Sequence, residues 1–264
     1  MAGMMTIGID IGSVATKGVL LSDGLVLQTR TCFTGYNVEA VARSIYEQLL
    51  EAENLSEASV YGIVSTGYGR NSVSFAHKAF TEIMCHGTGA RFLNPTVRAV
   101  IDIGGQDSKV IILNEEGKVT NFVMNDKCAA GTGRFLEVMA RALEVDLDCF
   151  GSLSLQSEQP APISNLCTVF AESEVISLIA KGEKRENIIA GIHEAIGSRV
   201  GAMAVRAGLG SGLSLMMTGG VARNIGVVKV LERILGCPIQ VSPLAQLTGA
   251  IGAAFLARGL VQGR

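Results

Sequence analysis

Two short segments of the chain repeat one pattern of residues that could bind a phosphorylated ligand and a metal ion. The first, DIGSVATK, begins at Asp10, and the second, DIGGQDSK, begins at Asp102. Aligned without a gap, the two segments also match Lys17 with Lys109. A carboxylate at the end of a buried strand can hold a hydrated divalent cation, and glycines let backbone N–H groups approach phosphate oxygens. The repeat therefore predicts two hairpins that hold a polyphosphate and Mg²⁺.

A third glycine-rich turn follows the apolar run at 213–218. It reads GGVARN from Gly219 to Asn224 and leads into a helical pattern at Val227–Leu235. A turn that opens a helix presents free N–H donors and the positive end of the helix dipole to an anion or to the edge of a nucleobase. Together with the two hairpins, this turn predicts the adenosine part of a nucleotide site.

The elements that must position these turns form two similar halves. Each hairpin consists of an apolar run, a glycine-rich turn and a second apolar run, and a third short strand follows at Leu25–Thr29 and at Lys118–Val123. Helical patterns follow each half, as at Glu39–Glu53 and Arg134–Leu143. We therefore expect an α/β protein with two related lobes and a cleft between them.

Two of the six cysteines stand where a thiolate could act as a metal ligand. Cys128 precedes the helical pattern that begins at Arg134, and Cys167 precedes one at Val169–Ala180. A thiol near a helix N-terminus has a lowered pKa and readily binds a metal. Two thiols are too few for a closed tetrahedral zinc site, whereas a two-fold axis would bring four together, which suits a [4Fe–4S] cluster. The alternative is that both are structural thiols. The other four are expected to be small buried residues or near-surface thiols: Cys32, Cys85, Cys149 and Cys237.

Four motifs together carry a resemblance to a known family. DKCAAGTGRFLE and LCTVFAESEVISLIAKG, with DIGGQDSK and MTGGVARN, resemble the activators of 2-hydroxyacyl-CoA dehydratases, a group that includes the ATPase subunits of benzoyl-CoA reductase. The group belongs to the actin/sugar kinase/Hsp70 ATPase superfamily, and the resemblance extends over almost the whole chain. It implies two ribonuclease-H-like, actin-type lobes with a nucleotide cleft, one lobe at 1–97 plus 246–264 and the other at 98–245.

The resemblance also implies an activity and its partners. It implies a homodimer with one [4Fe–4S] cluster bridging the subunits, two cysteines coming from each. Binding and hydrolysis of ATP would swing two helices beside the cluster and push one low-potential electron into a partner, a 2-hydroxyacyl-CoA dehydratase or a benzoyl-CoA-reductase-like component. Ferredoxin or flavodoxin would supply that electron.

Residue roles follow from the same resemblance. Asp10 and Asp102 would hold Mg²⁺ through water, and Gln106 would orient an attacking water with Asp107 nearby. The remaining assignments are phosphate contacts at Gly12, Ser13, Thr16 and Lys17 on one side and Gly104 and Gly105 on the other, an adenosine pocket at Gly219, Gly220 and Asn224, and cluster ligation by Cys128 and Cys167.

Composition excludes several other classes of protein. Hydrophobic residues make up 48% of the 264 residues and charged ones 17%, so we expect a folded core. The 22 basic residues are balanced by 24 acidic ones, which argues against a nucleic-acid partner. No apolar run reaches the ~18–20 residues of a membrane span, and the start lacks the basic region of a signal peptide. We therefore expect a cytoplasmic protein.

Two alternative functions and three minor features complete the expectations. The alternatives are a small-molecule, sugar-type kinase of the same superfamily and an ATP-gated interaction module without a redox centre. The turn at 65–70 is interpreted either as part of the cleft or as a plain loop. Glu82 and His86, four residues apart, are expected to form a pair on a helix surface, and Leu247–Leu256 to be a packed core helix.

Overall fold

The computed structural model describes residues 4–164 and 168–262. The chain divides into two compact units. Unit 1 comprises Met1–Arg98, Leu113–Thr120 and Gln246–Arg264, and unit 2 comprises Ala99–Ile112 and Asn121–Ala245.

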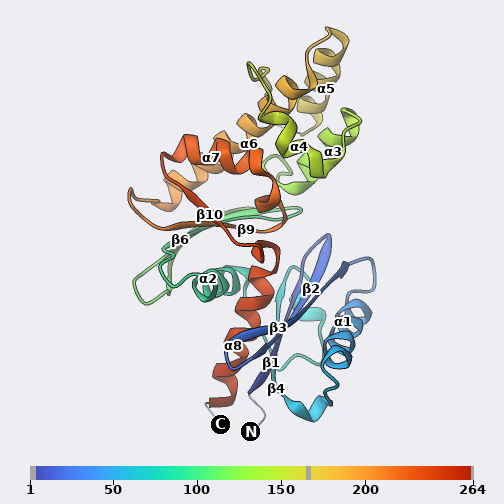
Figure 1. Cartoon of the computed structure of the whole chain (residues 1–264), viewed down its shortest axis with the longest axis vertical. Coiled ribbons are helices and arrows are strands. Elements are labelled where there is room, and N and C mark those ends of the chain that lie inside the picture. The colour runs from blue at the N-terminus through green and yellow to red at the C-terminus, as the bar shows by residue number, and fades with distance from the viewer. Residues whose placement is uncertain (1–3, 165–167, 263–264) are drawn as a thin grey trace. The chain divides into compact units, whose positions relative to one another are not determined.

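Unit 1 is built on a five-stranded sheet (Figure 1) with the order β3-β2-β1-β4-β5. The strands are β1 (Met5–Ile11), β2 (Ala15–Ser22), β3 (Leu25–Phe33), β4 (Val60–Gly67) and β5 (Lys78–Ala79). β1 and β2 form the antiparallel hairpin that the first repeat predicts, and β3 extends it to a meander. β4 returns parallel to β1 on its other side, which places the end of β4 beside Asp10.

Helices cover both faces of this sheet. They are α1 (Val38–Ala52), α2 (Glu82–Leu93) and α8 (Thr248–Gln262), with short 3₁₀ turns η1 (Glu57–Ser59), η2 (Arg70–Ser72) and η4 (Ala245–Leu247), the last of which leads into α8. Alternate residues of β1 face opposite sides, so Ile7 and Ile9 pack in one cluster with Ile45 and Leu49 of α1. Gly8 faces α8 instead.

Glycines let α8 approach β1 and α2 very closely. A Cβ atom on Gly8 would lie 2.0 Å from the Ala250 carbonyl oxygen, and one on Gly252 would lie 1.8 Å from the Cys85 carbonyl oxygen. No real side chain fits at those distances. The expected core helix near the C-terminus is thus confirmed, with Ala250 fully buried.

The segment Leu113–Thr120 groups with unit 1 through two arginines. Arg91 donates to the Glu115 carbonyl at 3.1 Å, and the Arg98 Nε donates to the Leu113 carbonyl at 3.1 Å. Arg91 also lies against Gly117, whose φ of +81° suits a tight turn. The lobe boundaries predicted from the sequence place this segment in the second lobe, at 98–245, whereas it groups here with unit 1.

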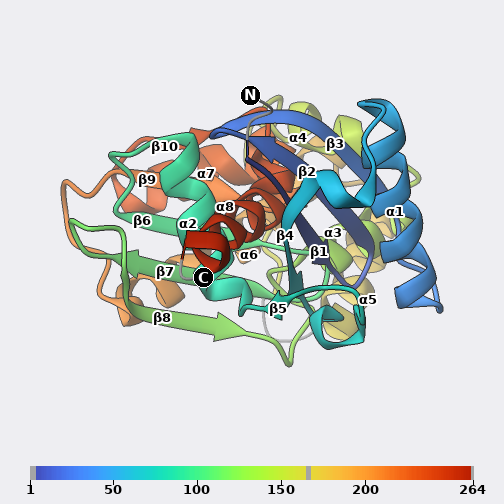
Figure 2. The same ribbon diagram turned by 90° about the horizontal axis from the view of Figure 1, so that it is seen from below.

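Unit 2 repeats the sheet of unit 1, with the order β10-β9-β6-β7-β8. Its strands are β6 (Ala99–Ile103), β7 (Ser108–Leu113), β8 (Val119–Asn125), β9 (Leu215–Thr218) and β10 (Ile239–Val241). β6 pairs antiparallel with β7 and parallel with β9, as β1 pairs with β2 and β4. Figure 2 shows β7 and β8 side by side at one end of this sheet. The expected α/β fold with two related halves is confirmed.

Five α-helices and one 3₁₀ turn complete the described part of unit 2. They are α3 (Gly133–Ala142), α4 (Leu147–Ser154), α5 (Thr168–Ala180), α6 (Arg185–Ala207), η3 (Gly220–Arg223) and α7 (Ile225–Leu235). By length and composition, α6 is the one described helix that could cross a membrane, but 72% of its apolar stretch is buried inside the protein. That burial is typical of a core helix, and Ile192, Ile196 and Val200 of α6 pack in the core of the unit.

Candidate functional site

The first hairpin holds a buried carboxylate against a lysine. Asp10 and Lys17 are cross-strand partners, and Lys17 Nζ lies 3.2 Å from Asp10 Oδ2. The Asp10 residue is only 4% exposed, whereas the Lys17 side chain is 15% exposed and can be reached from outside the hairpin. An ammonium group in this position forms a charged hydrogen bond with the carboxylate and can also contact an anionic ligand.

The turn of the first hairpin is fixed by its own hydrogen bonds. The Gly12 N–H donates to the Ala15 carbonyl at 3.1 Å, and the Thr34 hydroxyl donates to the Gly12 carbonyl at 2.7 Å. Thr16 is fully buried, and its hydroxyl is hydrogen-bonded to that of Thr34 at 3.0 Å. Of the expected phosphate contacts here, Ser13 and Lys17 are therefore the accessible side chains.

The second hairpin has the same pair and one more carboxylate. Lys109 Nζ lies 3.2 Å from Asp102 Oδ2, as in the first hairpin, and 2.8 Å from Asp107 Oδ2. The Lys109 and Asp102 side chains are 1% and 3% exposed, and that of Asp107 is 22% exposed. Gln106 stands exposed in the turn between the two strands.

Glycines of the second turn bind the start of helix α3. The Gly133 N–H donates to the Gly104 carbonyl and the Arg134 N–H donates to the Gly105 carbonyl, both at 2.8 Å. These N–H groups belong to the first turn of α3 and have no acceptor within their own helix. The glycine turn is thereby joined directly to the helix that follows Cys128.

A Thr-Gly pair stands at the end of strand β4 in unit 1 and of strand β9 in unit 2, and the sequence motifs did not identify either threonine as part of the site. Thr218 pairs with Asp102 in the parallel register, and its hydroxyl donates to Asp102 Oδ1 at 2.9 Å. Thr66 occupies the same register position beside Asp10. A signal was present in the sequence, because each Thr-Gly pair follows an apolar run. Thr66 also lies within the segment 65–70, which was interpreted either as part of the cleft or as a plain loop.

The glycine after each threonine has no room for a side chain. Gly67 has a φ of +91°, and a Cβ there would lie 2.6 Å from Asp10 Oδ1. Gly219 has a φ of +85°, and a Cβ there would lie 2.8 Å from Asp102 Oδ1. Both conformations favour glycine, and both bring backbone close to the aspartate. Each unit therefore has an aspartate, a lysine, a threonine and a glycine at equivalent positions of its sheet.

Asn224, expected in the adenosine pocket, has a structural task. Its Oδ1 accepts the Val227 N–H at 3.1 Å and caps helix α7, while its Nδ2 lies 3.2 Å from His193 Nε2. Gly220, by contrast, borders open space, since nothing lies within 4 Å of where its Cβ would be. Of the three expected adenosine contacts, Gly220 is the one that the structure leaves most accessible.

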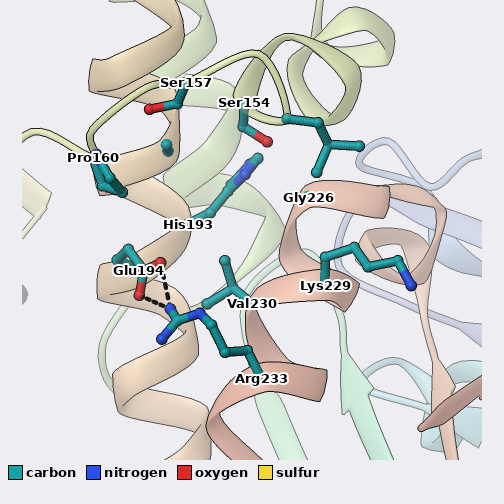
Figure 3. A pocket seen from close by; sticks show the side chains of 11 residues that line it. Ser154, Ser157, Pro160, His193, Glu194, Gly226, Lys229, Val230 and Arg233 are labelled. Atoms are coloured by element: carbon teal, nitrogen blue, oxygen red, sulfur yellow. Dashed lines mark hydrogen bonds and ion pairs between the residues drawn. The ribbon is translucent and has the colours of Figure 1, made fainter.

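His193 lies at the back of a pocket between α4, α6 and α7 (Figure 3). The pocket has a volume of about 230 Å³, and Lys229 and the ion pair between Arg233 and Glu194 line it as well. Burial lowers the pKa of His193 to about 3, so its ring is neutral at pH 7. Because Asn224 Nδ2 is a donor, Nε2 accepts and Nδ1 carries the proton, and Nδ1 has no partner within the described part of the chain.

The loop of Cys128 is ordered by groups other than the thiol. Asn125 Nδ2 donates to the Cys128 carbonyl at 2.9 Å, and the Thr132 hydroxyl donates to the Ala129 carbonyl at 2.6 Å. Gly131 has a φ of +88°, and α3 begins two residues later at Gly133. Cys128 is a free, partly exposed cysteine. Cys167, the second expected ligand, lies outside the described residues, directly before α5.

Within residues 4–164 and 168–262, no group of three or more His, Cys, Asp or Glu side chains could hold a metal ion. Of the other cysteines, Cys85 is buried, and burial raises its pKa to about 12, while Cys149 is exposed.

The expectation that Glu82 and His86 form a pair on the surface of α2 is wrong for His86, which is buried at 5% exposure. The reason is α8, which packs on α2 and places Gly249 beside the His86 ring.

Comparison with known proteins identifies the family. Residues 7–257 match the model of the BadF/BadG/BcrA/BcrD ATPase family. The chain belongs to this family. It is 49% identical over 254 residues, 96% of each chain, to the (R)-2-hydroxyglutaryl-CoA dehydratase activating ATPase of Acidaminococcus fermentans. Membership confirms the expected resemblance and the expected ATPase class.

Solved structures agree with this family and with the fold. The activator of the 2-hydroxyisocaproyl-CoA dehydratase from Clostridium difficile with bound ADPNP superimposes with a TM-score of 0.91 at 44% identity, covering 98% of this chain and 96% of that one. A ROK family glucokinase from Streptomyces griseus superimposes with a TM-score of 0.59 at 15% identity, covering 97% and 99%. The second likeness shows a shared fold alone.

Proposed function

We propose that this chain is an ATP-hydrolysing activator that delivers one low-potential electron to a 2-hydroxyacyl-CoA dehydratase or a related benzoyl-CoA-reductase-like component. Membership of an ATPase family supports the hydrolysis, and the names of its relatives support this class of partner. Ferredoxin or flavodoxin would supply the electron. The sugar kinase alternative is not favoured, because the likeness to a sugar kinase is confined to the fold.

The observation that carries the proposal is the connection between the second hairpin and the Cys128 loop. Two 2.8 Å hydrogen bonds join the Gly104 and Gly105 carbonyls to the first N–H groups of α3. A Cβ on Gly133 would lie 3.1 Å from the Gly104 oxygen, so the helix approaches the turn closely. A shift of the turn when phosphate binds or leaves would therefore move α3 and the loop that carries Cys128.

In this proposal each hairpin contributes to nucleotide binding. Lys17 and Ser13 contact phosphate oxygens, and the N–H of Gly220 faces the adenosine. Asp10 and Asp102, held by their lysines, would orient the water shell of Mg²⁺, and they fit this role because both are buried carboxylates and carboxylate oxygens suit this ion. Gln106, exposed in its turn, orients the attacking water.

Cys128 and Cys167 would ligate the [4Fe–4S] cluster. Cys128 fits this role because its loop is held by Asn125 and Thr132, which leaves its thiol free to bind iron. Two such cysteines from each of two copies would complete four ligands, so the proposal includes a homodimer. When bound, the cluster supplies the transferable electron.

The first test is the content of iron and acid-labile sulfide in protein purified without oxygen, with the mass of the dimer measured in parallel. We expect about two iron and two sulfide per chain, which is about four of each per dimer. Cys128→Ser should abolish both, whereas Cys149→Ser, at an exposed cysteine outside the site, should retain both. ATP hydrolysis should persist in Cys128→Ser.

Retention of iron by Cys128→Ser would contradict the ligand assignment. An unaltered protein that holds no iron, even after reconstitution, would remove the redox role and leave an ATP-gated interaction module. Formation of ADP that depends on added sugar would instead support the kinase.

A further inference from the structure

The two lysines that the repeat matches differ sharply in their surroundings. Lys17 has one carboxylate partner, Asp10, and its side chain is 15% exposed. Lys109 bridges two carboxylates, Asp102 at 3.2 Å and Asp107 at 2.8 Å, and is 1% exposed. The position of Asp107 is occupied by Ala15 in the first hairpin.

Because of these differences, the two hairpins have different net charges, and their lysines differ in whether the ammonium group can be reached by a ligand. Asp10 and Lys17 together are neutral, and the ammonium group still has a route to solvent. The second hairpin carries two carboxylates and one ammonium group, a net charge of −1. With Lys109 enclosed between its carboxylates, a phosphate oxygen cannot reach its ammonium group without displacing one of them.

We propose that Lys109 is a positioning residue, an internal counterion that holds Asp102 and Asp107 together, whereas Lys17 alone is the lysine that contacts phosphate. This inference rests on the proposed nucleotide binding and assigns different tasks to residues that are identical in the repeat. Thr218 completes the arrangement, because its hydroxyl occupies Asp102 Oδ1 while Lys109 occupies Oδ2. The carboxylate is thus fixed at both oxygens.

The two assignments differ in what a second substitution can restore. If Lys109 acts only by neutralising its carboxylates, then removing the charge of Asp107 should repair the loss of Lys109. Lys109→Met changes the net charge of the hairpin from −1 to −2, which repels an anionic nucleotide, and adding Asp107→Asn returns it to −1. If Lys109 instead touched phosphate, Asp107→Asn would improve ADP binding in the Lys109→Met background no more than it does in the unaltered protein.

The experiment is a double-mutant cycle of ADP affinity at fixed Mg²⁺ and salt, measured by isothermal titration calorimetry. Asp107→Asn is combined with Lys109→Met, and with Lys17→Met as the matched control. We expect Lys17→Met to weaken ADP binding roughly 10- to 100-fold, the loss of a charged hydrogen bond. In the Lys17→Met background, Asp107→Asn should change the ADP affinity by the same factor as it does in the unaltered protein, because the two effects are expected to be additive.

For Lys109→Met we expect weaker ADP binding that returns to within about threefold of the unaltered protein in the double variant. A double variant that folds but binds as poorly as Lys17→Met would overturn the inference. If Lys109→Met alone fails to fold, the double variant decides by the same criterion, because its hairpin has the native charge. An unaltered protein that does not bind ADP would overturn the proposed function as well.

Discussion

Replacing each of the two equivalent threonines by valine should have very different effects on stability. The Thr218 hydroxyl donates to the buried Asp102 carboxylate at 2.9 Å, whereas the Thr66 hydroxyl, at the same register position, has no oxygen or nitrogen partner among the described residues and interacts with the Cys85 thiol. A hydrogen bond to a charged group contributes about 1.5–3 kcal/mol, so Thr218→Val should lower the free energy of unfolding by that amount. Thr66→Val removes a buried hydroxyl that interacts with a thiol, a weak hydrogen-bonding group, and should change the free energy of unfolding by less than about 1 kcal/mol.

The assay is denaturation by urea, followed by far-UV circular dichroism, with the midpoint and slope compared between the variants. Valine has nearly the shape of threonine, so packing is matched and each position serves as the control for the other. An equal loss in both variants would refute the reasoning, because it would mean that the threonine side chain matters for its shape and not for its bond to the aspartate.

Two further predictions concern buried groups in the two units. Burial lowers the pKa of His193 to about 3, below its value of about 6.5 in the unfolded chain, so the unfolded state binds more protons between these values and stability falls as pH falls below 6.5. Urea titrations should show about 2 kcal/mol less stability at pH 5 than at pH 7 from this residue, a difference that His193→Phe removes. Gly252→Ala should cost several kcal/mol, since its Cβ would lie 1.8 Å from the Cys85 carbonyl oxygen. Gly259→Ala on the same helix meets nothing within 4 Å and should stabilise by about 0.5–1 kcal/mol, and thermal melts of the pair separate the two.

Local patterns in the sequence predicted much of the fold and the location of the turns. The repeated aspartate, glycine and lysine identified both hairpins, because each hairpin closes within a few residues and its signal is local. The helical patterns that begin at Arg134 and Val227 match α3 and α7 within two residues. The expected helix at Val169–Ala180 matches α5 equally well.

What the sequence did not predict depends on contacts between distant segments. Thr66 lies next to Asp10 only because β4 pairs with β1, and a Thr-Gly pair is too common to indicate this by itself. The buried position of His86 depends on α8, far along the chain. The different surroundings of Lys17 and Lys109 could not be read from a motif that contains both, because burial is a property of the whole unit.

The division of unit 1 into separated segments has a consequence for the order of events during synthesis. Its sheet and the helices α1 and α2 lie within the first 98 residues, but α8, which covers one face, begins only at Thr248. Roughly 150 residues must therefore be made before that face can close, which at ~5–20 residues per second is about 8–30 s on the ribosome. During that interval Val64 and Cys85 lack the Ala253 and Ala257 neighbours of their cluster. Unit 2, whose last residue is Ala245, can complete its core first, so the N-terminal half of this protein is the last to finish folding.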